Sequence, residues 1–150
     1  MRTILCAFLL SLGILRSQGL LRLYEGKIQN SLDKTVSLKG CNLGNWLMLE
    51  MWMLNYTDRG FADQYDFIKT LETRFGEEET EGLMDIYRTN WIRGSDFDII
   101  KSFGMNTVRL PFDYKLLMDY DEKPFCLKDD AWEWFDQAIS MAKKREMYVI

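Results

Sequence analysis

Histidine is absent from the 150 residues of the chain. Its absence excludes a Ser/His/Asp or Cys/His catalytic set, and any zinc site with histidine ligands, within these residues. The three cysteines, Cys6, Cys41 and Cys126, lack the spacing of metal ligands, and no CxxC motif is present. The sequence therefore implies no metal and no cofactor.

The sequence also lacks linker-like tracts and runs of basic residues. We find no internal repeat, low-complexity tract or Pro/Gly/Ser-rich linker, so the sequence predicts one domain over residues 20–150. The formal net charge is -4 and no basic run occurs, which argues against nucleic acid as a partner. The hydrophobic fraction of 47% is that of a globular protein. Sugars remain possible ligands because they require no net charge.

No apolar run is long enough to span a membrane. The N-terminal run, residues 4–15, is far shorter than the roughly twenty residues that a spanning helix needs. Arg2 precedes it and small residues follow up to Gly19, which is the order of a secretory signal peptide over residues 1–19. The alternative is a buried amphipathic helix. We expect a secreted, extracellular protein, or a periplasmic one in a bacterium.

Two features depend on this export. Cleavage after Gly19 removes Cys6 and leaves Cys41 and Cys126, which the sequence allows to be either paired or free. Asn55 begins an Asn-Tyr-Thr glycosylation sequon, which matters only in a eukaryotic secretory pathway.

Hydrophobic periodicity and turn residues predict alternating strands and helices. We expect a hairpin between two extended segments, with Asn30 and Asp33 in its turn, a capping box at Ser95 and Asp98, and a helix capped by Asp129 or Asp130. The predicted extended segments are 20–28, 35–39, 107–110 and 147–150, and the predicted helices are 62–75, 77–90, 95–103 and 130–145.

This order is typical of parallel βαβ units, whose sheets are covered by helices. The fold class is therefore α/β. Three parallel strands do not close a barrel, and the sequence stops inside the apolar segment 148–150. We interpret the chain as the front part of a larger barrel, truncated in about the third strand.

An arginine stands at the end of one predicted strand. Thr107 to Leu110 is too short and too β-branched for a helix, and Pro111 has no backbone donor with which to continue the strand. In a strand covered on both faces, the guanidinium of Arg109 requires a carboxylate or a polar cleft. Arg109 is therefore a candidate site residue, with a structural ion pair as the alternative.

Two motifs resemble a known family. The stretches LKGCNLGNWLMLEMW (38–52) and FGMNTVRLPFDY (103–114), linked by NWIRGSDFDIIKS (90–102), resemble the start of a glycoside hydrolase family 5 barrel. The likeness is strongest to its exo-β-1,3-glucanase and β-glucosidase branch and covers roughly residues 35–150. It implies a (β/α)8 TIM barrel with its active site at the C-terminal ends of the strands.

The resemblance also implies roles for individual residues. Arg109 matches the arginine that holds the nucleophilic glutamate ionised and oriented, for which a bidentate guanidinium is suited. Glu50 matches a glutamate that binds sugar hydroxyls beside the scissile bond, and Trp52 matches an aromatic residue that stacks on a sugar face. Trp46 is interpreted as a packed core residue.

The chain departs from the branch at two positions in the first motif. Asn45 stands where the branch has the second glycine of a pair, and Met51 stands where it has a proline. We therefore expect the loop after the first barrel strand to differ in shape.

The function that the resemblance implies is retaining hydrolysis of O-glycosidic bonds in β-glucans. The acid/base and nucleophile glutamates of the family lie beyond Ile150, so these residues alone are expected to be inactive. We expect a β-glucan or oligosaccharide substrate and a monomer at full length. The alternatives are an endo-acting cellulase or mannanase, a noncatalytic carbohydrate-binding relative, and an interaction module unrelated to sugars.

Export predicts a new N-terminus. If residues 1–19 are a signal peptide, protein recovered from outside the cytoplasm begins at Leu20. N-terminal sequencing of the secreted material measures this directly. Intact Met1 on a soluble cytosolic pool would contradict it.

Overall fold

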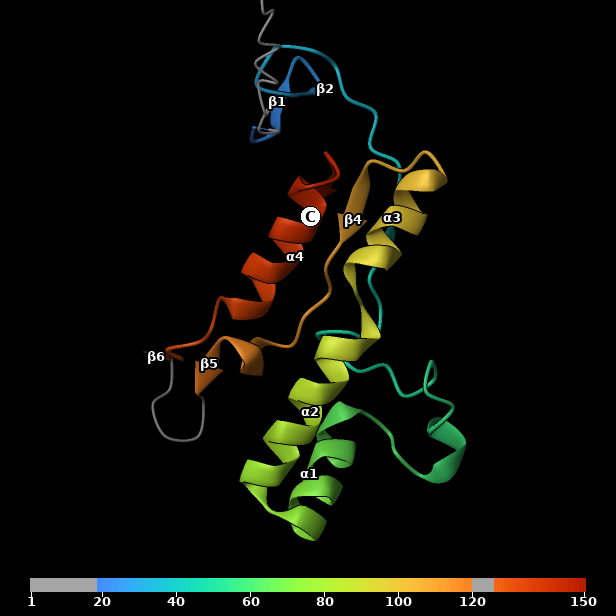
Figure 1. Ribbon diagram of the computed structural model, residues 1–150, viewed down its shortest axis with the longest axis vertical. Helices are drawn as coiled ribbons and strands as arrows, with labels where there is room; N and C mark the ends of the chain where they lie inside the picture. Colours follow the sequence, from blue (N-terminus) through green and yellow to red (C-terminus); the bar gives the residue numbers. More distant parts are fainter. Residues whose placement is uncertain (1–18, 120–125) are drawn as a thin grey trace, which may run out of the picture.

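The computed structural model describes residues 19–119 and 126–150, so that all but Gly19 of the expected signal segment lies outside the described residues (Figure 1). The elements are β1 (Arg22–Tyr24), β2 (Lys27–Gln29), β3 (Gly40–Asn42), η1 (Thr57–Arg59), α1 (Gln64–Phe75), α2 (Glu77–Trp91), α3 (Gly94–Ser102), β4 (Thr107–Arg109), η2 (Tyr114–Leu116), β5 (Met118–Asp119), β6 (Cys126–Leu127), α4 (Glu133–Lys143) and β7 (Tyr148–Val149). In Figure 1 the β1–β2 hairpin lies at the upper end and the α1–α2 pair at the lower end.

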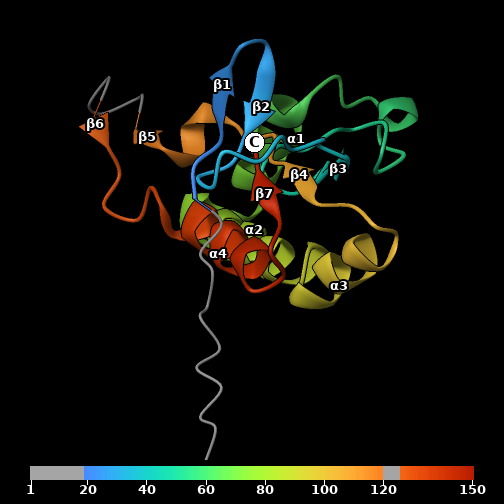
Figure 2. The same cartoon turned by 90° about the horizontal axis from the view of Figure 1, so that it is seen from above.

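A parallel sheet in the order β3-β4-β7 forms the centre of the fold. The register pairs Cys41 with Val108, and Val108 in turn with Val149. Helices α3 and α4 lie on one side of this sheet (Figure 2). The predicted alternation of strands and helices around a parallel sheet is therefore confirmed.

Burial changes along strand β4, and its last residue is the exposed one. Val108 is completely buried and belongs to the core beneath α3 and α4, whereas Arg109, the next residue of β4, is exposed. Because successive side chains of a strand point to opposite faces, Thr107 and Arg109 share the face turned away from the helices. Asn42, the register partner of Arg109, lies on that same face.

Two hydrophobic clusters hold the elements together. The first lies between the sheet and the helices and includes Trp46, Phe97 and Val108; full burial of a side chain such as Phe97 contributes about 1.5–3 kcal/mol. The second packs Met51 and Met84 against partly buried side chains of α1, α2 and the loop after β3. The loop after β3 therefore contributes to both clusters.

Helices α1 and α2 form where the sequence predicts them. The Asp63 side chain caps α1 by accepting a hydrogen bond from Asp66 N at 3.0 Å, and Gly76 ends the helix with a φ of 87° that a glycine adopts without strain. The acidic first turn of α2, which begins at Glu77, is exposed to solvent. Within the described ranges, no helix is long and apolar enough to cross a membrane.

The caps expected for the next two helices are wrong. Arg93 is the N-cap of α3, where Arg93 N donates to Asp96 Oδ2 at 2.6 Å, so Ser95 already lies inside the helix. Asp98 instead pairs with Arg145 of the turn after α4. At α4 the N-cap is Trp132 without a side-chain cap bond, because the preceding chain forms a backbone turn through Asp130 O.

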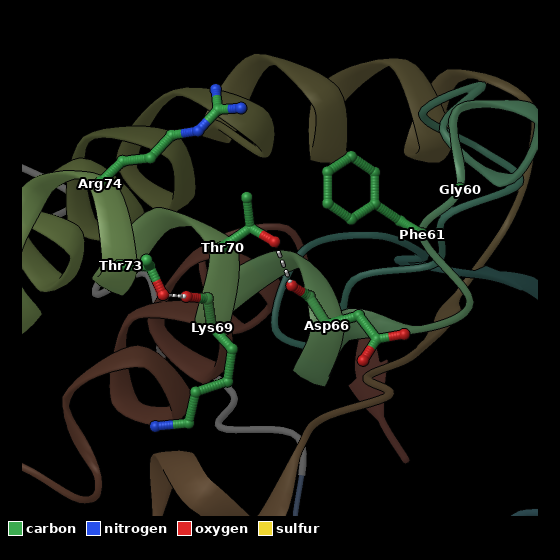
Figure 3. A pocket seen from close by; sticks show the side chains of 7 residues that line it. All are labelled: Gly60, Phe61, Asp66, Lys69, Thr70, Thr73 and Arg74. Carbon is green, nitrogen blue, oxygen red and sulfur yellow. Dashed lines mark hydrogen bonds between the residues drawn. The ribbon is translucent and has the colours of Figure 1, made fainter.

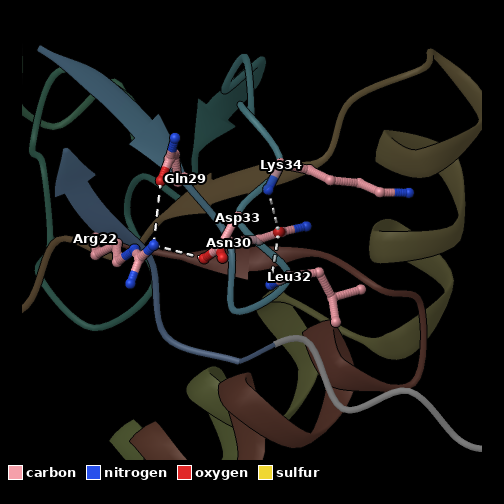
Figure 4. A network of polar contacts seen from close by, with 6 residues as sticks. All are labelled: Arg22, Gln29, Asn30, Leu32, Asp33 and Lys34. Carbon is pink, nitrogen blue, oxygen red and sulfur yellow. Dashed lines mark hydrogen bonds and ion pairs between the residues drawn. The ribbon is translucent and has the colours of Figure 1, made fainter. Parts of the chain in front are cut away.

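The predicted hairpin is displaced. Its turn is at Glu25 and Gly26, whose φ values of 47° and 72° are those of a tight turn between β1 and β2. Except for Gln29, both strands lie within the first predicted extended segment. Asn30 forms a second turn by accepting from Leu32 N and Lys34 N (Figure 4). The second predicted segment contributes only a bridge at its start, and the β5–β6 pair was not predicted.

Strands β3 and β4 lie so close together at Gly40 that only a glycine fits there. A Cβ added to Gly40 would lie 1.9 Å from the backbone oxygen of Thr107. We expect Gly40→Ala to lower the free energy of unfolding by about 2 kcal/mol or more, because the strands must separate to accept it. Gly82→Ala is the control: a Cβ at this site in α2 meets nothing within 4 Å, so the change stabilises by about 0.5–1 kcal/mol. Denaturant unfolding of both variants measures the difference, and equal stability would contradict the clash.

The pair between α3 and α4 predicts an acid-dependent contribution to stability. Arg145 Nε and Nη2 donate to Asp98 Oδ1 and Oδ2 at 2.6 and 2.8 Å, and these bonds lower the pKa of Asp98 from its ordinary 3.8. A lowered pKa in the folded state means that the stabilisation is present above pH 3.8 and is lost as the pH falls below it.

We therefore expect Asp98→Asn to lower the Tm at neutral pH by no more than a few degrees, because the Asp98 side chain is 65% exposed. The difference from wild type should shrink as the pH falls below 3.8. Asp58→Asn, which changes an exposed aspartate without an ion pair among the described residues, is the control. A Tm difference independent of pH would rule out the ion pair as its cause.

Candidate functional site

The end of strand β4 carries Arg109 on the face of the sheet that is turned away from α3 and α4. Its carbonyl accepts a hydrogen bond from Leu43 N at 2.8 Å, which continues the pairing of β3 with β4 for one residue beyond Asn42. The side chain is exposed and, among residues 19–119 and 126–150, forms no hydrogen bond or ion pair. The structural ion pair considered for Arg109 is therefore not present within the described residues.

Arg109 borders a hollow on this face. The cavity has a volume of about 240 Å³ and is lined by Leu38, Gly40, Cys41, Asn42, Thr107, Arg109 and Ile150. Its polar groups come from the ends of two neighbouring parallel strands. An open polar hollow of this kind accommodates a side chain or a polar ligand group next to the guanidinium.

Glu50 and Trp52 lie in the loop after β3. Leu49 and Met51 point into the second hydrophobic cluster and are 7% and 4% exposed, whereas Glu50 is half-buried and Trp52 is 70% exposed. Buried and more exposed side chains thus alternate from Leu49 to Trp52, next to a turn in which Met53 N donates to Glu50 O at 2.9 Å. The acidic and aromatic side chains therefore project from the loop while their neighbours anchor it.

The structure places Glu50 and Arg109 at the same end of the sheet without joining them. A Cβ added to Gly44 would lie 2.9 Å from Glu50 Oε2, so the carboxylate lies against the backbone two residues beyond Asn42, the register partner of Arg109. Among the described residues no hydrogen bond or ion pair links Glu50, Trp52 and Arg109. Glu50 and Trp52 also do not line the hollow at Arg109.

The two residues that depart from the first motif both fit the loop in which they stand. Asn45 has a φ of 59°, a left-handed conformation that glycine adopts freely and that asparagine tolerates better than most residues. Met51 is buried against Leu49 and Met84. Trp46 is 1% exposed and its Nε1 donates to Arg88 O at 2.8 Å, which confirms that it is a packed core residue.

Gln64 and Asp113, which the sequence did not single out, tie the two site loops together. Gln64 Oε1 accepts from Leu49 N at 2.5 Å, and Gln64 Nε2 donates to Asp113 Oδ2 at 2.6 Å. Asp113 N donates to Leu47 O at 3.0 Å. The loop that carries Glu50 is thereby fixed to the loop after β4, although no spacing in the sequence indicates these contacts.

A second hollow, of about 440 Å³, lies along α1, and neither Arg109, Glu50 nor Trp52 lines it (Figure 3). Thr70 and Thr73 line it, but their hydroxyls donate to the backbone oxygens of Asp66 and Lys69 on the same helix. Lys69 forms an ion pair with Glu72. The polar groups of this hollow are thus largely engaged within α1.

Neither a metal site nor a disulfide is formed by the residues that the structure describes. No three metal-binding side chains gather there, and Cys41 and Cys126 are free thiols. Burial raises the pKa of the Cys41 thiol above its ordinary value. The thiols therefore contribute no cross-link to this part of the chain.

Curated proteins with similar sequences are fungal glycosidases. The chain is 28% identical over 146 residues to "Probable glucan 1,3-beta-glucosidase A" of Aspergillus niger and 27% identical over 121 residues to the protein of that name in Aspergillus fumigatus. It is 27% identical over 124 residues to the "Beta-xylosidase" of Phanerodontia chrysosporium. These matches cover 94%, 81% and 83% of this chain but only 34%, 29% and 25% of the relatives. The chain thus spans about a quarter to a third of their length.

The fold is found in a solved enzyme structure. Rutinosidase from Aspergillus niger superposes with a TM-score of 0.59 at 20% identity, over 74% of this chain and 31% of that one. No family model matches the chain. The mixed α/β fold with its parallel sheet thus corresponds to about a third of the rutinosidase structure. From these similarities we conclude that the chain is a distant homologue of fungal glucan 1,3-beta-glucosidases.

Proposed function

We propose that the chain is the first part of a (β/α)8 barrel in a retaining glycoside hydrolase that cleaves terminal β-glucosidic bonds of β-glucans. The observation that carries the proposal is Arg109, an exposed guanidinium at the end of a parallel strand with no partner among the described residues. A charge in that position is suited to a carboxylate brought by another strand of a barrel. The sugar substrate is supported by the named activities of the relatives.

In this mechanism Arg109 acts on the nucleophile. Retaining hydrolysis needs one carboxylate to attack the anomeric carbon and another carboxyl group, about 5–5.5 Å away, to act as acid and then as base. Both glutamates come from outside these residues. Arg109 holds the nucleophile ionised and oriented through its planar pair of donors, which a lysine cannot reproduce.

Glu50 and Trp52 bind the sugar. The half-buried Glu50 carboxylate accepts hydrogen bonds from sugar hydroxyls, and the 70% exposed Trp52 ring offers a flat apolar face for stacking. Both lie in the loop after β3, at the same end of the sheet as Arg109. We place the protein outside the cytoplasm, where β-glucans are accessible.

A second candidate activity is hydrolysis of β-xylosides, which the Phanerodontia chrysosporium relative favours. Rates on 4-nitrophenyl β-glucoside, 4-nitrophenyl β-xyloside, laminarin, cellulose and mannan, measured on the protein that contains this chain, separate the candidates. Preference for laminarin and the glucoside supports the proposal. Binding of laminarin without any hydrolysis would identify a noncatalytic relative and overturn it.

Substitution of Arg109 tests its role. Because the side chain is exposed and has no partner among the described residues, Arg109→Ala should leave the Tm nearly unchanged. It should lower kcat and kcat/KM together by at least about 10- to 100-fold, the effect of losing even one of two hydrogen bonds to a charged group. Arg109→Lys should recover only part of the rate. Arg74→Ala, which removes an exposed arginine of α1, is the control.

The pH profile provides the decisive measurement. A carboxylate deprived of a neighbouring cation has a higher pKa, so the acidic limb of kcat/KM should move to higher pH in Arg109→Ala. It should not move in Arg74→Ala. An unchanged acidic limb with a near-normal kcat would refute the catalytic role of Arg109.

A further inference from the structure

A buried asparagine shapes the loop that carries Glu50. Asn45 is 0% exposed and has a φ of 59°, which a non-glycine residue adopts only where its surroundings compensate. A glycine would reach the same backbone conformation without strain. The asparagine side chain must therefore supply something that a glycine does not.

Every polar atom of the Asn45 side chain has a partner. Its Oδ1 accepts a hydrogen bond from Glu50 N at 2.8 Å, and its Nδ2 donates to Tyr87 Oη at 2.8 Å. Tyr87 Oη in turn donates to Asn45 O at 2.5 Å. A flipped amide would set Nδ2 against the N–H of Glu50, so this network fixes the amide orientation.

The last turns of α2 supply the side chains that contact this loop. The Tyr87 ring stacks on Trp91 with ring centres 5.2 Å apart, and Trp91 Nε1 donates to Gly44 O at 3.1 Å. Figure 1 shows the chain after β3 passing this end of α2. Burial raises the pKa of the Tyr87 phenol, so the hydroxyl keeps its proton and remains a donor.

These contacts converge on Glu50, the residue proposed to bind the sugar. Asn45 fixes the backbone nitrogen of Glu50, and the carboxylate lies against Gly44, whose carbonyl is held by Trp91. Within the described part of the chain, the Glu50 carboxylate itself forms no hydrogen bond or ion pair. The backbone of Glu50 is restrained while its side-chain oxygens stay available to a ligand.

We propose that Asn45 and Tyr87 are positioning residues that set the Glu50 carboxylate for a sugar hydroxyl beside the scissile bond. The inference rests on the proposed function and assigns to α2 a part in substrate binding that neither sequence motif indicates. Displacement of a binding group by about 1 Å weakens its hydrogen bonds without unfolding the protein. Loss of either residue should therefore act through Glu50.

The experiment is a double-mutant cycle on the protein that contains this chain, with laminarin oligosaccharides as substrate. Tyr87→Phe keeps the ring on Trp91 and removes only the hydroxyl, and Asn45→Gly keeps the backbone conformation and removes only the amide. Each should raise KM by about 2- to 10-fold, the value of one hydrogen bond, with a smaller change in kcat. Glu50→Ala should raise KM at least as much.

Combination with Glu50→Ala distinguishes positioning from general support of the fold. If Asn45 and Tyr87 act through Glu50, adding either change to Glu50→Ala raises KM no further. Additive KM effects, or an unchanged KM in both single variants at an unchanged Tm, would overturn the inference. Tyr65→Phe, which changes an exposed tyrosine of α1, is the matched control and should leave KM and Tm unchanged.

Failure of the proposed function gives a different result. A wild-type protein that hydrolyses no glycoside refutes the proposed function, and the inference with it. A wild type that hydrolyses laminarin while Glu50→Ala has a normal KM refutes only the sugar contact and its positioning. Should Asn45→Gly fail to fold, Tyr87→Phe alone completes the cycle.

Discussion

The pairing of β3 with β4 is the contact on which the rest of the arrangement depends. Gly40 allows the two backbones to approach, and the register that follows places Asn42 opposite Arg109 at the C-terminal end of both strands. Every candidate site residue is then located relative to that end: Arg109 on the strand itself, and Glu50 and Trp52 on the loop that leaves Asn42. A slip of one residue would turn Arg109 towards the helices, where its charge would be buried without a partner.

The loop after β3 is stable because two clusters and two polar links hold it. Its buried residues belong partly to the sheet core and partly to the cluster under α1 and α2. Gln64 connects it to Asp113 in the loop after β4, and Asn45 connects it to Tyr87 of α2. Because an unpaired buried polar group is costly, each of these links also restricts where the loop can lie. Stability and the placement of Glu50 therefore depend on the same contacts.

Sequence periodicity identified what depends on hydrophobic burial and missed what depends on contacts between distant residues. The α1 and α2 helices and the strand at Thr107 follow from apolar spacing and from Gly76, and the parallel order follows from their alternation. The capping box failed because Asp98 has a stronger partner in Arg145, 47 residues away. The hairpin was misplaced because Glu25 adopts a positive φ that its residue type does not favour. The sequence motifs point to the candidate residues Arg109, Glu50 and Trp52. The contacts of Gln64, Asp113 and Tyr87 join residues far apart in the sequence and are visible only in the folded chain.

The exposure of Arg109 on the sheet face turned away from α3 and α4 also bears on aggregation. A flat face of paired strands tends to stack on another copy when it is apolar, and a charged residue on that face opposes this because stacking would remove the charge from water. Here the guanidinium and the neighbouring amide of Asn42 occupy that face. A side chain proposed to hold a catalytic carboxylate would thus also disfavour stacking of this sheet face on a copy of itself wherever the face is open to solvent.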